Sequence, residues 1–173
     1  ESERVIHVES LPETMNQVDV AEGRLPEKKG ECIIDMDTAA SYDIKIGDTL
    51  TFLSGTDTEL SENLATEEYT VVGTCSSPMY ISFNRGSTNI GSGEIDMFAY
   101  VTDESFDQEV YSQAYVTVKG AKGATAFTDS YREIVDKVKE NVEGISDVRC
   151  DIRYAEIMDE ANEKVAEAES ELK

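Results

Sequence analysis

The stretch VDVAEGRLPEKKGECIIDMDTAASYDIKIGDTLTF, residues 18–52, carries the strongest fold signals of this 173-residue chain. Strands are predicted at residues 18–21, 31–36 and 49–53, because each run is largely apolar or β-branched and is bounded by Gly, Pro or Asp. Asp37 is expected to cap a short helix between the second and third of these strands, since its carboxylate can accept hydrogen bonds from free backbone N–H groups. The stretch therefore predicts a compact β-rich module.

Outside this stretch, further strands are predicted at residues 4–10, 69–75, 97–102 and 114–119. The loop between residues 76 and 93 is long and rich in Gly, which is typical of a functional or a mobile segment. Its apolar residues form either a contact surface for another molecule or ordinary packing beneath the loop. The candidate contact residues are Met79, Tyr80, Phe83 and Ile90.

The last third of the chain changes from strand signals to helix signals. Between residues 125 and 143 apolar side chains recur at spacings of three and four, which places them on one helical face, and Gly144 is the expected C-cap. Alternating apolar residues then predict a strand at 145–153. With the strand at 114–119, this helix and strand would form a β-α-β unit. The helical face consists of Phe127, Tyr131, Ile134, Val138 and Val142.

A heptad-like seam follows Tyr154, and acidic residues flank it. Its narrow width, with Ala at every second contact, favours a close crossing with another helix, either an antiparallel returning helix or one from a second subunit. The alternative is a terminal helix that lies on its own domain. The seam residues are Met158, Ala161, Val165, Ala168 and Leu172.

These elements together predict an α+β fold. Residues 1–153 are expected to form its core, with a β-rich part at 1–110 and the β-α-β part at 111–153. Residues 154–173 are expected to begin a helical coiled-coil segment. The chain starts at Glu1 and ends inside a helical pattern, so we expect it to be a piece of a longer protein.

Charge and hydropathy restrict the classes of partner. With 37 acidic and 15 basic residues the net charge is −22, which repels the phosphate backbone of nucleic acids. No apolar run reaches the roughly 18 to 20 residues that a membrane-spanning helix needs.

Motifs for catalysis, cofactors and metals are lacking. The sequence has no nucleophile elbow, no zinc-protease motif and no phosphate loop, so we expect no catalytic, cofactor-binding or metal-binding residues. His7 is interpreted as a structural histidine within a strand. Cys32 and Cys75 lie in apolar strand contexts and are interpreted as small buried hydrophobic residues, with a redox role as the alternative.

Several phrases, in this order along nearly the whole chain, resemble the extracytoplasmic domain of MacB/FtsX-like ABC-transporter permeases. They are EGRLPEKKGECIID (22–35), AASYDIKIGDTL (39–50), YTVVGTCSSPMYISFNRGSTNIGSGEIDMFAYV (69–101), YVTVKGAKG (115–123) and VRCDIRYAEI (148–157). The resemblance implies a fold like the MacB periplasmic core, and related permeases often continue here into a long extracellular coiled coil.

The resemblance also implies a function at the extracytoplasmic side of the cell membrane. There a non-catalytic domain of the permease would couple ATP-driven transmembrane movement to the export or handling of a peptide, lipoprotein or lipid-linked substrate. The implied partners are a cytoplasmic ATPase subunit and either a second permease copy or an antiparallel returning helix. The alternative is a free-standing extracellular binding or adhesion module with an oligomerising helix.

Overall fold

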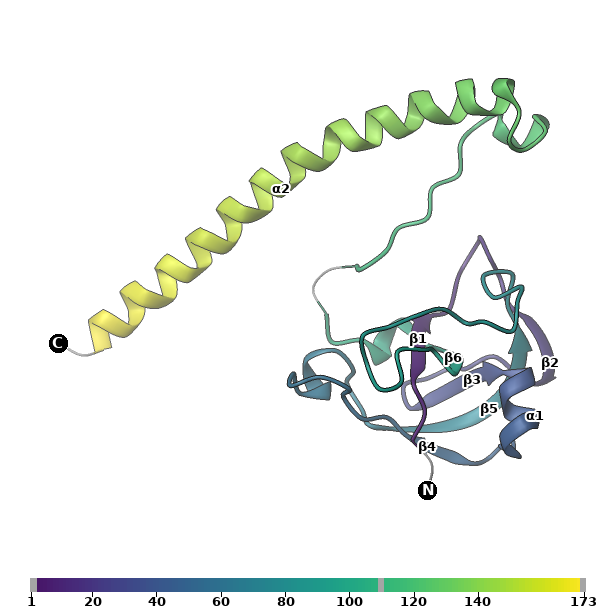
Figure 1. Ribbon diagram of the computed structural model, residues 1–173. Helices are drawn as coiled ribbons and strands as arrows, with labels where there is room; N and C mark the ends of the chain where they lie inside the picture. The colour runs from purple at the N-terminus through teal and green to yellow at the C-terminus, as the bar shows by residue number, and fades with distance from the viewer. Residues whose placement is uncertain (1–2, 109–110, 172–173) are drawn as a thin grey trace. The chain divides into compact units, whose positions relative to one another are not determined.

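The structure is a computed structural model that describes residues 3–108 and 111–171. Two compact units compose it, unit 1 (Glu1–Ala114) and unit 2 (Tyr115–Lys173). Unit 1 is a mixed sheet with one short α-helix, and unit 2 is dominated by one long helix (Figure 1). The fold is therefore of the mixed α and β kind, as the sequence predicts.

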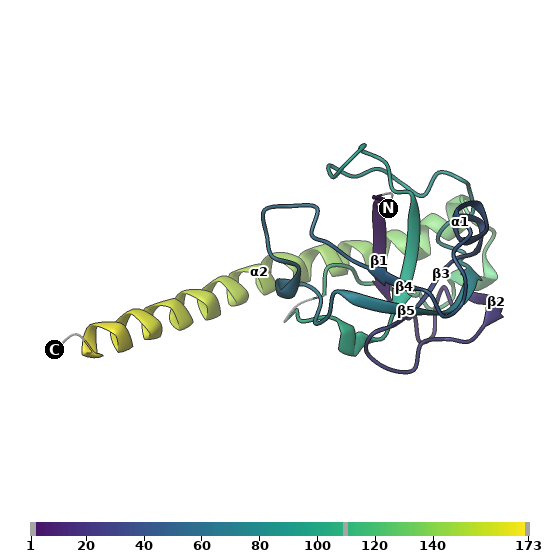
Figure 2. The same ribbon diagram turned by 90° about the horizontal axis from the view of Figure 1, so that it is seen from below.

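Unit 1 contains six strands in the spatial order β1-β6-β3-β5-β2, with β4 also paired to β5. The pairs β1–β6 and β3–β5 are parallel and the other pairs are antiparallel. In Figures 1 and 2, β1 crosses the direction of β5, as expected for a twisted sheet. The strands are β1 (Ile6–Ser10), β2 (Asp19–Gly23), β3 (Glu31–Asp35), β4 (Thr49–Thr51), β5 (Glu68–Ser76) and β6 (Met97–Val101).

The two central strands, β3 and β6, are buried at every residue. Their side chains alternate between two apolar clusters, so that Cys32 and Ile34 belong to one cluster and Ile33 belongs to the other. The helix α1 (Met36–Tyr42) contributes Ala39 to the first cluster. Tyr80, from the long loop between β5 and β6, packs against the second cluster. Both clusters are covered by segments of unit 1, which explains why residues 32–34 of β3 and the whole of β6 are continuous apolar runs.

Strands β2 and β5 approach each other closely at a pair of glycines, Gly23 and Gly73. Gly23 has a φ of 78°, and a Cβ atom added to it would lie 2.3 Å from the carbonyl oxygen of Val72. A Cβ atom on Gly73 would lie 2.5 Å from the carbonyl oxygen of Arg24. The Gly-Arg-Leu-Pro motif thus begins with a residue that no side chain can replace without moving the backbone.

An ion pair closes the loop between β2 and β3. Arg24 donates to both carboxylate oxygens of Glu31 at 2.7 Å, and the backbone N–H of Glu27 donates to the same carboxylate at 3.1 Å. These hydrogen bonds, first from Arg24 and then from Glu27, lower the pKa of Glu31 to about 2. The polar GRLPEKKG loop is therefore tied to the first residue of β3.

Unit 2 corrects the prediction of a β-α-β unit. One helix, α2 (Asp129–Glu171), runs through Gly144 and through the predicted strand at 145–153. A single exposed Gly costs a helix only about 1 kcal/mol and does not end it. The alternating residues of the predicted strand include Val148 and Ile152, whose spacing of four fits a helix equally well. The predicted strand at 114–119 is also absent, and the described part of unit 2, residues 115–171, contains no strand that could pair with it.

Three further details differ from the sequence prediction. The boundary predicted at residue 153 lies inside α2, whereas the two compact units divide after Ala114. Phe127 precedes α2, where it has a φ of 67° and is 85% exposed. The N-cap of α1 is Asp35 rather than Asp37, since the Asp35 carboxylate accepts from the backbone N–H of Asp37.

Among the described residues, no helix has the length and apolar character needed to cross a membrane.

Replacing Gly23 by Ala should destabilise unit 1 strongly. The added Cβ atom would clash with the β5 backbone in addition to straining a positive φ, so we expect a loss of at least about 3 kcal/mol of unfolding free energy. Gly47→Ala is the matched control, because Gly47 also has a positive φ but has open space around it. It should cost only about 1–2 kcal/mol. Urea unfolding followed by near-UV circular dichroism measures the unfolding free energy of both variants. Equal losses of stability in the two variants would contradict a clash at Gly23.

The depressed pKa of Glu31 predicts a pH dependence of stability. Because the folded-state pKa lies at about 2, below the ordinary value of 4.5, this carboxylate stabilises the folded state above pH 4.5. That contribution is lost as the pH falls from about 4.5 through about 2. Urea unfolding should show a steeper loss of stability over this range in the native chain than in Glu31→Gln, and Arg24→Gln should flatten the profile in the same way. Parallel profiles for all three chains would disprove the assignment.

Candidate functional site

The loop between β5 and β6, residues 77–96, is anchored to the sheet by Arg85. Arg85 is 9% exposed and donates to Asp35 through Nε at 2.7 Å and through Nη2 at 2.9 Å. Nη2 also donates to the Asp37 carboxylate at 2.9 Å, and Nη1 donates to the backbone carbonyls of Tyr80 and Ser82. The guanidinium thus joins the end of β3 and the start of α1 to the loop's own backbone.

The acidic partners of Arg85 favour the charged form of its guanidinium. Burial acts to lower the pKa of Arg85, but its hydrogen bonds to Asp35 and then to Asp37 outweigh burial and raise that pKa overall. Asp35 is 1% exposed and accepts a further hydrogen bond from the Thr38 hydroxyl at 2.8 Å. A buried carboxylate with this many donors is fully paired, so the cluster is a structural anchor.

A second anchor is formed by Tyr80. Its ring stacks on Phe98 with the ring centres 4.4 Å apart, and its hydroxyl is hydrogen bonded to Nδ1 of His7 at 2.6 Å. The same hydroxyl donates to the carboxylate of Glu9. His7 and Glu9 lie on β1, at one edge of the sheet, so the loop is fixed at this edge as well. His7 therefore has a structural contact of the kind that the sequence analysis expects.

The far end of the loop is held by close packing and by the backbone. A Cβ atom on Gly55 would lie only 2.2 Å from Cγ2 of Ile90, which shows how closely Ile90 packs on the 52–58 segment. The carboxylate of Asp96 accepts from the backbone N–H of Val5 at 2.8 Å. Contacts near residues 80, 85, 90 and 96 thus restrain the loop along its length.

The loop exposes apolar side chains beside the Tyr80 anchor, at Met79, and between the two anchors, at Ile81 and Phe83. Ile81 is 92% exposed, Phe83 is 88% exposed and Met79 is 39% exposed. Of the four contact residues proposed from the sequence, the structure exposes Met79 and Phe83, whereas Tyr80 and Ile90 pack inward. Ile81 is the member that the sequence analysis missed. We define the apolar tip as Met79, Ile81 and Phe83.

The anchoring role of Arg85 had a signal in the sequence that was not used. Arg85 is the only charged residue between Ser76 and Gly93 in a chain with a large excess of acidic residues. A single cation in an uncharged loop of an acidic protein is well placed to pair with buried carboxylates. The sequence could have indicated an anchor at this position, although not its two partners.

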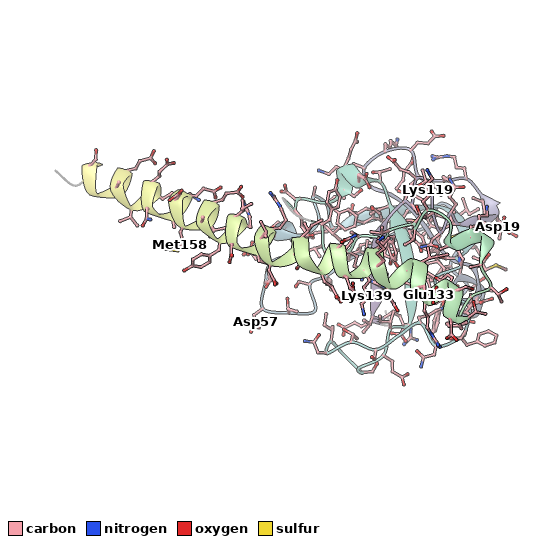
Figure 3. All side chains as sticks on the ribbon, turned by 90° about the horizontal axis from the view of Figure 1, so that it is seen from above. Asp19, Asp57, Lys119, Glu133, Lys139 and Met158 are labelled. Atoms are coloured by element: carbon pink, nitrogen blue, oxygen red, sulfur yellow. The ribbon has the colours of Figure 1, made fainter. Side chains whose placement is uncertain are left out.

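The second candidate surface is α2. None of its described side chains is buried, and Figure 3 shows side chains projecting from all around the helix, with Met158 labelled in its C-terminal half. Of the predicted seam, Met158 is 42% exposed, Val165 is 58% exposed, and Ala161 and Ala168 are also exposed. Leu172 lies outside the described residues. The structure thus places four seam residues on α2, and none of the four is buried.

The cysteines fall into two groups. Cys32 and Cys75 are fully buried, and burial raises the pKa of each thiol to about 12. Cys150 is exposed on α2. At neutral pH the two buried thiols carry almost no thiolate, so Cys150 is the accessible cysteine of the folded chain.

Other ligand sites have little support. Among the described residues, no group of three or more His, Cys, Asp or Glu side chains has the geometry of a metal site. An open hollow of about 290 Å³ is lined by Leu11, Thr102 and four carboxylates, those of Glu13, Glu27, Asp103 and Glu104.

In comparisons with known proteins, the chain matches no protein-family model, no curated protein and no solved structure.

Removing the Arg85 side chain should destabilise unit 1 by about 3–5 kcal/mol in Arg85→Met, because it leaves the buried Asp35 carboxylate without its cation. Arg85→Lys should lose less, since it keeps the charge but not the two-pronged geometry. The matched control is Arg132→Met, whose exposed pair with Asp129 should contribute under about 1 kcal/mol. Urea unfolding measures all three, and a loss for Arg85→Met as small as that of the control would refute the anchor.

Proposed function

We propose that this chain is the non-catalytic extracytoplasmic domain of an ABC-transporter permease subunit. The observation that carries the proposal is the apolar tip, an exposed apolar surface on a loop that Tyr80 and Arg85 anchor to the sheet. A loop held in this way can transmit a displacement of the sheet to a bound molecule without folding or unfolding. Such a role needs shape and rigidity rather than reactive groups.

The family assignment in the proposal is supported by the sequence phrases given above. The stretch at 18–52 contains the Gly-Arg-Leu-Pro motif, and its glycine meets β5 where no side chain fits. The arginine of the motif holds Glu31 at the start of β3. The resemblance therefore involves residues with defined structural roles rather than composition alone.

In the proposed mechanism, the cytoplasmic ATPase subunit closes on ATP and moves the membrane helices of the permease. The sheet of unit 1 follows this movement as a rigid body, because β3 and β6 are buried throughout and the long loop is anchored to them. The apolar tip contacts the extracytoplasmic substrate, of which a peptide, a lipoprotein or a lipid-linked molecule offers matching apolar surface.

Cys150 provides the test of this proposal in cells that express the full-length gene product. A membrane-impermeant maleimide should label the protein in intact cells, and Cys150→Ser should remove most of the label that is added to this domain. The buried Cys32 and Cys75 should react only after unfolding, because their thiols are inaccessible and have a pKa of about 12.

Two outcomes would overturn the proposal. Labelling of Cys150 only after cell lysis would place the domain on the cytoplasmic side. Recovery of the full-length protein in the supernatant after ultracentrifugation of lysed cells and culture medium would favour a free-standing binding or adhesion module instead.

A further inference from the structure

Helix α2 carries two seams in heptad spacing, apolar at every position except Asn141, and they meet near its middle. In each seam the spacing alternates between three and four residues without exception. We define the N-seam as Tyr131, Ile134, Val138, Asn141, Ile145, Val148 and Ile152. We define the C-seam as Tyr154, Met158, Ala161, Val165 and Ala168.

The two seams are out of phase by one residue. Continuing the N-seam beyond Ile152 would reach residues 155 and 159, whereas the C-seam uses Tyr154 and Met158. Because each residue of an α-helix turns by about 100°, this shift rotates the C-seam around the axis by about the same angle. A partner helix with an unbroken heptad pattern can follow one seam but not both. A partner with the same break at the same height can follow both.

A second copy of α2 has this break, and an antiparallel orientation aligns it. The break is the one-residue shift between the two seams. When the two-fold axis between the two antiparallel helices passes Arg153, the break of one helix lies opposite the break of the other. The N-seam of one copy then faces the C-seam of its partner over the whole overlap. We propose that α2 is a dimerisation helix that pairs with α2 of a second copy in this antiparallel register.

Side-chain volumes favour this register over a parallel one. In the antiparallel register the small C-seam residues meet large N-seam residues, Ala161 with Ile145 and Ala168 with Val138. In a parallel pair Ala161 and Ala168 would each face their own copies, which would leave thin layers between thick ones. Uniform layers fill space better than alternating thin and thick ones.

The remaining layers also pair a C-seam residue with an N-seam residue. Met158 faces Val148, and Tyr154 faces Ile152 next to the two-fold axis. Val165 faces Asn141, so this layer is the weakest. In the single chain Met158 is 42% exposed and Val148 is 58% exposed, so pairing would remove apolar surface from water.

Charge along the helix favours the same orientation. Residues 129–152 contain seven acidic and four basic residues, whereas residues 154–171 contain seven acidic and one basic residue. A parallel pair would place the two more acidic halves side by side. The antiparallel pair places each more acidic half beside a less acidic one, which reduces the repulsion. Some repulsion remains, so added salt should strengthen the dimer.

Disulfide crosslinking of the 173-residue chain tests the register directly. In a Cys150→Ser background, Ile145→Cys combined with Ala161→Cys should form a covalent dimer on mild oxidation. Each single variant should stay monomeric on a non-reducing gel, and a mixture of the two should crosslink to each other. Ring closure within one helix is excluded, since these positions are about 24 Å apart along the axis.

Solution mass gives a second readout without new cysteines. Light scattering should find twice the 19.1 kDa chain mass, and Val165→Glu should weaken the dimer by about tenfold or more. Ala166→Glu adds the same charge outside the seam and should leave the mass close to that of the dimer.

Three outcomes would overturn the proposal. Efficient crosslinking of Ala161→Cys alone would show a parallel pair. A monomeric mass at high protein and salt concentration, with no crosslinking of the double variant, would show that α2 does not pair with a second copy. Equal weakening by Val165→Glu and Ala166→Glu would remove the C-seam from the interface. None of these outcomes depends on whether the chain belongs to a permease.

Discussion

The buried Asp35 carboxylate is the constraint on which the architecture of unit 1 depends. It ends β3, caps α1 and accepts two hydrogen bonds from Arg85, so three separate segments meet at one group that is 1% exposed. A carboxylate in this position is stable only when it is fully paired. The pairing therefore determines where the loop between β5 and β6 must lie, and with it the position of the apolar tip.

The two units expose apolar side chains in different ways. In unit 1 the apolar tip is small, and anchors on both sides hold it in place. In unit 2 two seams follow one another along a 43-residue helix that has no buried residue among those described. A long helix of this composition gains most of its stability from packing rather than from intrinsic propensity. Both surfaces suit a domain that works by holding and moving other molecules, which is the function proposed above.

How far the sequence predicts the structure depends on the kind of element. The strands of unit 1 were predicted within two residues of their ends, because apolar runs bounded by Gly, Pro and Asp are local signals. The predicted strand at 145–153 was wrong. Its apolar residues fit period two and a helical face equally, and Gly144 could be read as a cap or as an interior residue.

The six strands, the short helix after β3, the acidic character and the apolar spacing of the C-terminal segment are predictable from local patterns and composition. The pairing of Arg85 with Asp35, fifty positions away, depends on the folded arrangement of the chain, as does the inward turn of Tyr80 to Phe98 while Ile81 and Phe83 face solvent. Burial and ion pairing between distant segments depend on how the sheet is ordered, and no local pattern encodes that order.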